Sequence, residues 1–456
     1  MITPEHIVKY KGIVSQKGNK VKQKRIFLKN AALITEKGDI LRHKNIFIKE
    51  GKICSVTDDT DRGAPMPECD KSVDCTGYYV SPGLVNLHCH CAMNIFKGIA
   101  EDVSADAWFN ENIFPYESRL TADDVYVGTK LGIAEMLDAG VTAFADHYFE
   151  EEAVLRAVLD MGIRADIAPT IFGTAPDFGS RLDAVSDFCE RNRDQSEYVA
   201  VRLGPHAPYT CPPDTLREIV KRAEQMDLGL HMHISETREQ VAASRELYGK
   251  TPFTMAYESG AFDRQMLIAH GLWVEEEDMA YLTERTWFAM CAKTYEKLAM
   301  GTGLAFRKRD RINYSFGTDG AASSNTLNVC EQARHYALLG KFESWDPCTY
   351  ETMEIWKAMM RGHEALPFHT GKIEPGYGAD LVIWDLKKPN TWPVYHPVTS
   401  ILYSSEPSNV AYTMVNGIFL KENGRLRMDE SALLDEGART QKALLERGKG
   451  NARVFY

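Results

Sequence analysis

The middle of the chain alternates short apolar runs with amphipathic segments, and this alternation limits the folds that it can adopt. Segments 123–139 and 214–226 begin with polar residues and space their apolar residues near the helical period. Strands that alternate with helices form parallel βα units. A barrel of eight such units uses roughly 250 residues, so we expect a closed (β/α)8 barrel over residues 79–366. A doubly wound open sheet is the alternative, although no Gly-rich phosphate loop follows the first strand. The strand-like runs are 144–146, 165–168, 199–203, 229–233, 266–270 and 313–317.

The two ends of the chain carry strand patterns without intervening helices. Residues 45–49 and 53–56 flank Glu50-Gly51-Lys52, which is a hairpin signature. Residues 379–384 and 412–419 have similar strand patterns near the other end. We therefore expect residues 1–78 and 367–456 to form one small β domain together, with a polar terminal helix over 431–448. The first 25 residues are rich in lysine and match no functional pattern.

Composition and charge exclude several classes of protein. No apolar run reaches the ~18 residues of a membrane span, and the N-terminal segment lacks the apolar core of a secretion signal. The net charge of −11 argues against a nucleic-acid groove, which needs concentrated positive charge. Ten cysteines scattered through 456 residues are typical of free thiols in a reducing compartment. We expect a cytoplasmic enzyme with a small-molecule substrate and neither a nucleic-acid nor a membrane partner.

Three segments that end strand-like runs carry side chains suited to metal binding. They are His88-Cys89-His90, His233-Ile234-Ser235-Glu236 and Gly317-Thr318-Asp319-Gly320. Alternate residues of a strand face the same side, so His88 and His90 project together at the mouth of the barrel. Three histidines and one aspartate suit a divalent metal of the zinc or iron(II) type better than calcium or magnesium, and manganese(II) also tolerates such ligands. His231 is interpreted as a packed strand histidine.

Two further side chains lie where they could act on a substrate beside the metal. Glu236 follows His233 by three residues, where the chain leaves the strand, which is typical of a general acid/base beside activated water. His270 ends the run 266–269, and a hydrogen-bonded strand end is the alternative interpretation. No lysine ends the run 199–203, so a single metal ion is expected rather than a lysine-bridged pair.

These motifs resemble the amidohydrolase superfamily, and within it the branch of methylthioadenosine/S-adenosylhomocysteine deaminases that also contains s-triazine chlorohydrolases. The resemblance runs from about Phe27 to Arg425 and rests on sequences spread along the chain. They are Ser81–His90, Trp108, Pro115, Leu131–Gly140, Gly204–Thr210, His233–Thr237, Gly317–Ser323 and Gly371–Gly376.

The resemblance implies a distorted (β/α)8 barrel, a β-sandwich-like domain built from both termini, and a pairing of barrels into a homo-oligomer. It also implies which residues bind the metal, which bind the substrate and which move protons. Glu236 would carry the proton to a ring nitrogen, and His270 and Asp319 would orient the attacking water. The implied metal ligands are His88, His90, His233 and Asp319, and the implied substrate-binding residues are Asp106, Trp108, Arg181, His206 and Glu236.

One stretch departs from the pattern of this branch. Its deaminases carry a Pro-x-Ser-Asn element before Lys-Leu-Ala-x-Gly, whereas this chain has Cys291-Ala292-Lys293-Thr294-Tyr295 there. We expect a hydrolytic deaminase of an adenosine-type nucleoside that releases ammonia. The altered 291–301 loop favours the alternative, a deaminase or dechlorinase of another N-heterocycle such as an s-triazine, guanine-like or pterin-like ring. An amide hydrolase and an inactive scaffold are weaker hypotheses, the latter because no ligand position is lost.

Overall fold

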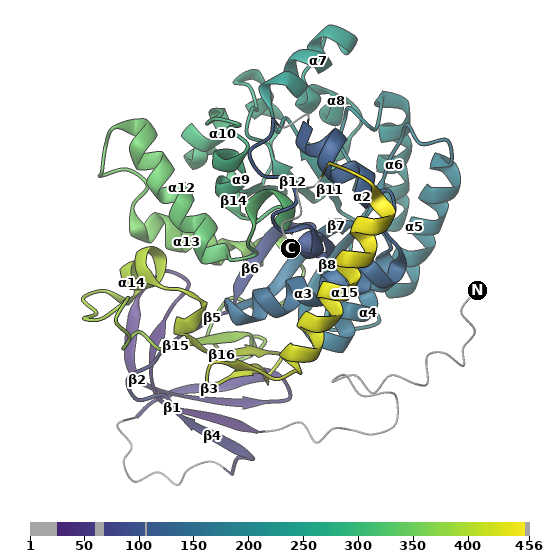
Figure 1. The fold of residues 1–456 in the computed structure, drawn as a ribbon. Coiled ribbons are helices and arrows are strands. Elements are labelled where there is room, and N and C mark those ends of the chain that lie inside the picture. Colours follow the sequence, from purple (N-terminus) through teal and green to yellow (C-terminus); the bar gives the residue numbers. More distant parts are fainter. Residues whose placement is uncertain (1–24, 60–67, 105–106, 452–456) are drawn as a thin grey trace.

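In the computed structural model, residues 25–59, 68–104 and 107–451 are described. Strands from both ends of the chain join in one nine-stranded sheet, which confirms the predicted β domain shared by the termini (Figure 1). β5 lies within the range predicted for the barrel, yet it pairs with β1 and, in antiparallel register, with β15. The strands of this sheet are β1 (Ile26–Ile34), β2 (Ile40–Lys49), β3 (Lys52–Asp58), β4 (Lys71–Asp74), β5 (Tyr79–Pro82), β15 (Leu381–Trp384), β16 (Val410–Val415), β17 (Ile418–Glu422) and β18 (Arg425–Leu426).

A barrel of parallel strands forms the rest of the core, as the alternating pattern predicted. Two parallel sheets meet through a bridge between Leu203 and Leu230. The backbone nitrogens of Thr318 and Asp319 donate to the carbonyl of His88 at 2.9 and 3.0 Å and join the last strand end to the first. The barrel strands are β6 (Leu84–Cys89), β7 (Val141–Tyr148), β8 (Arg164–Ile171), β9 (Val199–Val201), β10 (Gly204–Pro205), β11 (Leu230–Ile234), β12 (Met266–His270), β13 (Thr286–Met290) and β14 (Asn313–Phe316).

The long helices cover the outside of the barrel, and their ends follow local sequence signals (Figure 1). At the start of α3, the Thr121 hydroxyl accepts from the backbone of Asp124, whose carboxylate accepts from the backbone of Thr121, a capping box. The helices are η2 (Cys91–Phe96), η3 (Trp108–Ile113), α2 (Phe114–Glu117), α3 (Ala122–Asp138), α4 (Glu151–Met161), α5 (Phe178–Asn192), α6 (Pro213–Met226), α7 (Arg238–Tyr248), α8 (Pro252–Glu258), η4 (Ala261–Asp263), η5 (Glu277–Tyr281), α9 (Ala292–Lys297), α10 (Leu304–Arg307), η6 (Arg309–Arg311), α11 (Ala321–Ser324), α12 (Val329–Ser344), α13 (Thr352–Ala365), α14 (Pro397–Ser404), η7 (Pro407–Asn409) and α15 (Glu430–Gly448).

The terminal helix α15 is more than a surface appendage, because it lies along α3 and η2 of the barrel (Figure 1). Glu436 pairs with Lys130 at 3.2 Å, and the side-chain amide of Gln441 donates to the carbonyl of Ile95 at 3.0 Å. A buried ion pair joins the barrel to the terminal sheet, where Arg164 of β8 donates two hydrogen bonds to Asp380 at 2.8 and 3.0 Å. These contacts tie the terminal helix and the terminal sheet to the walls of the barrel.

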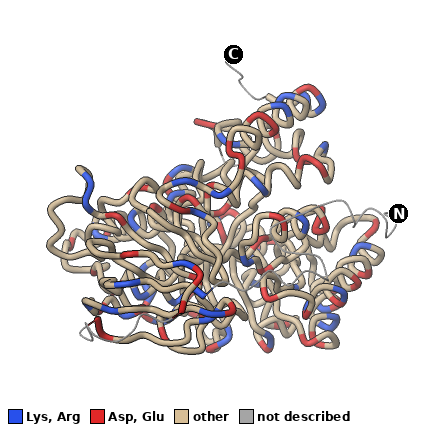
Figure 2. The backbone as a smooth tube through the Cα atoms, turned by 90° about the horizontal axis from the view of Figure 1, so that it is seen from below, with Lys and Arg blue, Asp and Glu red and all other residues tan. Residues whose placement is uncertain are grey.

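The surface shows charges of both signs along most of the fold. Lys and Arg positions are interspersed with Asp and Glu positions over the backbone (Figure 2). No helix in the described part of the chain combines the length and the apolar character of a membrane span.

Candidate active site

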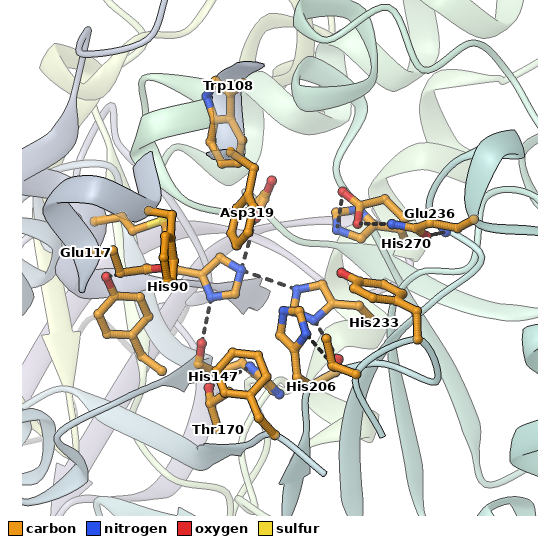
Figure 3. Close-up of a pocket in the computed structure, with 18 of the residues that line it drawn as sticks. His90, Trp108, Glu117, His147, Thr170, His206, His233, Glu236, His270 and Asp319 are labelled. Atoms are coloured by element: carbon orange, nitrogen blue, oxygen red, sulfur yellow. Dashed lines mark hydrogen bonds and ion pairs between the residues drawn. The ribbon is translucent and has the colours of Figure 1, made fainter. Parts of the chain in front are cut away.

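Four predicted ligand side chains converge at the carboxyl ends of the barrel strands. Nε2 of His90 lies 3.3 Å from Nε2 of His233 and 3.3 Å from Oδ1 of Asp319, and Nε2 of His88 lies 3.7 Å from the same oxygen. Ligand atoms about 2.0–2.1 Å from one tetrahedral ion are themselves roughly 3.3–3.4 Å apart. The spacing of these atoms therefore fits a single divalent metal ion of zinc size (Figure 3).

Hydrogen bonds from the far side of each imidazole aim its Nε2 at this centre. His90 Nδ1 donates to the carbonyl of His147 at 2.6 Å, and His233 Nδ1 donates to the carbonyl of His206 at 3.0 Å. His88 Nδ1 lies 2.9 Å from Nε2 of His231, and His88 Nε2 is buried with no hydrogen-bond partner among the described residues. A ring that donates through Nδ1 keeps the Nε2 lone pair for a metal.

The predicted packing role of His231 is therefore only part of what this side chain does. It is fully buried on β11, and its Nε2 is the partner that orients the His88 ring. His231 therefore supports the proposed metal ligand His88 and is not itself one of the proposed ligands. Its position two residues before His233 follows from the alternation of side chains along a strand.

The charges of the ligand groups suit a cation. Burial lowers the pKa of His88 to about 3 and that of His233 well below its ordinary value, so both rings are neutral. Burial opposes ionisation of Asp319, but the neighbouring rings of His88 and His90 hold its pKa well below the usual range. Burial alone would lower the pKa of His90, yet the hydrogen bond and charge of Asp319 raise it to about 9. A metal would replace the proton of His90.

Close backbone packing explains the glycine before the aspartate. A Cβ on Gly317 would lie 2.9 Å from both the Cβ and the carbonyl oxygen of His88. Only glycine lets β14 approach β6 this closely. Asp319 itself has a φ of +59°, and the hydroxyl of Ser323 donates to its Oδ2 at 2.6 Å.

Glu236 and His270 lie together beside the proposed ligands, and His270 also forms, with His88 and Asp319, a group of side chains spaced closely enough to hold a metal ion. Nε2 of His270 is 3.5 Å from Oε1 of Glu236, as the dashed line in Figure 3 marks. The amide of Gln240 donates to Oε2 of Glu236 at 3.3 Å, and its oxygen accepts from the Glu236 backbone at 2.9 Å. Gln240 also completes the capping box of Thr237 at the start of α7, so a helix end fixes the position of this carboxylate.

A cavity of about 730 Å³ opens above these groups. His90, His233, Glu236, His270 and Asp319 line its inner end (Figure 3). Aromatic and apolar side chains from several loops form much of the remaining wall: Met93, Trp108, Phe109, Phe114, Tyr148, Phe149, Phe172, Tyr209, Leu298 and Met300. A largely apolar cavity with a few converging polar groups is typical of a small-molecule site.

The model of the amidohydrolase family matches residues 79–420. The chain belongs to the amidohydrolase family. The 5-methylthioadenosine/S-adenosylhomocysteine deaminase of Symbiobacterium thermophilum is 38% identical over 374 residues, which are 79% of this chain and 85% of that protein. The 5′-deoxyadenosine deaminase of Methanosarcina mazei is 33% identical over 389 residues, 83% of this chain and 89% of that protein.

A crystal structure of an adenosine deaminase from Xanthomonas campestris with bound zinc has a similar fold. Its TM-score is 0.86 at 26% identity, and the match covers 92% of this chain and 98% of the other. The predicted family, barrel fold and class of hydrolase, acting on carbon–nitrogen bonds, are confirmed. The zinc-bound neighbour and the histidine-rich site together support a divalent metal in this amidohydrolase.

Besides Glu236, two of the predicted substrate residues line the cavity of this amidohydrolase. Trp108 of η3 does so while its indole nitrogen donates to the carbonyl of Ala322 at 3.3 Å. His206 does so with Nδ1 2.9 Å from the Thr210 hydroxyl. Asp106 lies outside the described residues. The roles assigned to these three residues remain predictions.

Arg181, the fourth predicted substrate residue, lies on α5 behind the cavity wall. Its Nη1 and Nη2 each donate to a carboxylate oxygen of Glu151 at 2.9 Å, and its Nε donates to the carbonyl of Thr170 at 3.2 Å. Thr170 lines the cavity, whereas Arg181 is not among the lining residues. In the structure this guanidinium therefore binds Glu151.

Two polar residues of the cavity were missed in the sequence. Glu117 of α2 lines the cavity and accepts a hydrogen bond at 2.8 Å from the Tyr148 hydroxyl, and burial raises the pKa of its carboxyl. His147 lines it next to His90, with Nδ1 3.1 Å from the Thr170 hydroxyl. β7 continues to Tyr148, two residues beyond the strand-like run 144–146 predicted from the sequence. Placing the end of the strand there would have identified His147 as another histidine at a strand end.

The atypical 291–301 segment forms α9 and its exit, and it contacts the site. Leu298 and Met300 line the cavity. The hydroxyl of Thr294 lies 3.1 Å from that of Ser323, which in turn donates to Asp319. This segment therefore shapes the cavity wall and supports the carboxylate ligand through one intervening side chain.

Proposed function

We propose that this amidohydrolase is a zinc-dependent hydrolytic deaminase of adenosine-type nucleosides. The observation that carries the proposal is one cavity with the proposed ligands His90, His233 and Asp319 and the carboxyl group of Glu236 at its inner end. Glu117 and Trp108 lie on the wall of the same cavity. The similarity to methylthioadenosine and 5′-deoxyadenosine deaminases over about four-fifths of the chain supports the same substrate class. Zinc is the proposed metal, because its ligand preference and radius fit His88, His90, His233 and Asp319.

The proposed chemistry assigns proton movements to named side chains. A divalent metal held by these four ligands would lower the pKa of water from 15.7 toward about 7 and supply a nucleophile at neutral pH. Glu236 holds the proton that passes to the ring nitrogen beside the carbon that carries the amino group. His270, 3.5 Å from Glu236, positions that carboxylate and the attacking oxygen. Addition gives a tetrahedral carbon, and the remaining proton of the attacking water passes to the amino group with the help of His270 and Asp319, so that ammonia leaves.

Glu117 is proposed to recognise the sugar. A carboxylate can accept hydrogen bonds from two neighbouring hydroxyls at once, and the Tyr148 hydroxyl fixes its orientation. Trp108 offers an aromatic face on the same wall, suited to contact with a flat base. His206 is proposed as a further contact to the sugar.

Ammonia release by the zinc-loaded protein tests the function. The panel holds adenosine, methylthioadenosine, 5′-deoxyadenosine, guanine, a pterin and an amino-s-triazine, with chloride release followed for a chlorinated triazine. Turnover of the nucleosides with kcat/KM of about 10⁴ M⁻¹s⁻¹ or more is the expected result. Turnover of free rings alone would replace the nucleoside proposal with the N-heterocycle alternative. Turnover of none would refute both.

A further inference from the structure

We propose that the cavity selects nucleosides whose 5′ substituent is neutral or cationic and excludes those that carry a carboxylate. This inference rests on the proposed function and narrows its range of substrates. The similar deaminase of Symbiobacterium thermophilum is named for both methylthioadenosine and S-adenosylhomocysteine, and we propose that this chain prefers the first. The first of these compounds ends in a neutral methylthio group and the second in an amino acid. The charges of the described cavity residues favour methylthioadenosine over S-adenosylhomocysteine.

The ionisable side chains in the cavity wall are acids and histidines. Glu117, Glu236 and Asp319 line the cavity, and neither Lys nor Arg is among its described lining residues. A bound metal would offset the charge of Asp319, and Glu236 holds a proton in the proposed chemistry, so Glu117 is the carboxyl group that remains to act on a substrate tail. Glu117 of α2 lies on the cavity wall beside His90, and we place the sugar and its 5′ substituent against this wall (Figure 3).

The arginine suited to bind a substrate carboxylate is already paired. Arg181 uses both terminal nitrogens for Glu151 and its third nitrogen for the Thr170 carbonyl. The Glu151 side chain is 10% exposed and that of Arg181 25%, so water screens this pair less than a surface pair. The two-point pair with Glu151 and the bond to the Thr170 carbonyl thus engage all three nitrogens of the guanidinium. Glu151 is therefore the residue that withholds Arg181 from the substrate.

The outer cavity offers apolar contact instead. Phe109, Phe114, Phe149 and Phe172 contribute to the wall, with Leu298 and Met300 from the atypical segment. A short thioether or methyl group gains from burial against such side chains. A carboxylate placed there loses its water without gaining a partner. Two like charges about 6 Å apart in a partly buried site repel by an amount equivalent to roughly 100-fold in kcat/KM.

The test compares three substrates that share one nucleoside. They are methylthioadenosine, S-adenosylhomocysteine and the methyl ester of S-adenosylhomocysteine, which keeps the length of the tail and removes its negative charge. We expect methylthioadenosine to exceed S-adenosylhomocysteine by about 100-fold in kcat/KM, and the ester to regain at least tenfold. Equal turnover of methylthioadenosine and S-adenosylhomocysteine would overturn the inference. An ester as poor as the acid would also overturn it, because tail size would then explain the preference.

A pair of variants tests the role of Glu151. Glu151→Gln removes the charge that holds Arg181 and is expected to raise S-adenosylhomocysteine turnover relative to methylthioadenosine by tenfold or more. Glu152→Gln is the matched control, because Glu152 pairs with Arg191 at the surface and leaves Arg181 untouched. An unchanged substrate ratio in Glu151→Gln would refute the part assigned to this pair. Failure of every nucleoside, methylthioadenosine included, would instead refute the proposed function.

Discussion

Replacing Glu236 by glutamine separates the proton carrier from the metal site. The side chain keeps its size, and its carbonyl can still accept from Gln240, which now donates at 3.3 Å. Neither Glu236 oxygen belongs to the ligand groups, so metal content should stay at one ion per chain. What is lost is the proton delivered to the ring, and general acid catalysis contributes typically 10²–10⁴-fold. We therefore expect kcat to fall by about 10²–10⁴, equivalent to about 2.7–5.4 kcal/mol of transition-state stabilisation.

The assay measures ammonia release under saturating methylthioadenosine, with metal determined on the same sample. Glu239→Gln is the matched control, since Glu239 is exposed on α7, which begins just after Glu236, and the substitution is chemically identical. Control activity should stay near wild type. A Glu236→Gln enzyme with one metal ion and more than about a tenth of wild-type kcat would refute the assignment of Glu236 as proton carrier.

Three further predictions concern metal, backbone and stability. Removal of the metal by a chelator should abolish ammonia release and lower the thermal unfolding temperature, because an ion at about 100 times its Kd stabilises by about 2.7 kcal/mol; zinc should restore both, and activity that persists in metal-free protein would contradict the site. Gly317→Ala should weaken zinc binding by tenfold or more in a competition titration, because its Cβ would lie 2.9 Å from the His88 carbonyl, whereas the unobstructed Gly179→Ala should bind as wild type. Arg164→Met should lower the free energy of unfolding by about 3–5 kcal/mol in urea titration, because it breaks a buried ion pair with Asp380. Arg191→Met, which breaks a surface pair, should lower it by at most about 1 kcal/mol, and equal losses in the two variants would contradict this reasoning.

The convergence of the four proposed ligand side chains could be predicted because the sequence features that produce it are local. Alternation along a strand brings His88 and His90 to one side, and the strand-end rule for barrels adds His233 and Asp319 from other segments. The same local reasoning recognised the barrel and located α3 and α6 to within one residue. Each of these inferences needs only the period of the side chains and the direction of the strands.

The substrate side of the cavity could not be predicted in the same way. Glu117 lies on a four-residue helix that follows a π-helix, and segments this short show no periodicity. Its place over the cavity depends on how the segment packs. Arg181 shows the complementary difficulty. An arginine at this position was expected to bind a substrate carboxylate. The carboxylate that it binds in the structure belongs to Glu151, 30 residues earlier at the start of α4, and only the folded structure brings the two side chains together.

Strained backbone at the strand ends indicates that the barrel, not the metal, holds the site in shape. Ser235, His270 and Asp319 have φ values of +47°, +66° and +59°, a region of backbone conformation that residues other than glycine rarely adopt. Such conformations cost about 1–3 kcal/mol each and persist only where the surroundings impose them. Here backbone hydrogen bonds impose them, since Asp319 donates to His88 at 3.0 Å and the residue after His270 donates to Ile234 at 3.0 Å. The backbone of the barrel therefore sets the positions of these strand ends. Metal-free protein should keep the circular dichroism of the folded barrel, unlike small zinc domains that unfold without their ion.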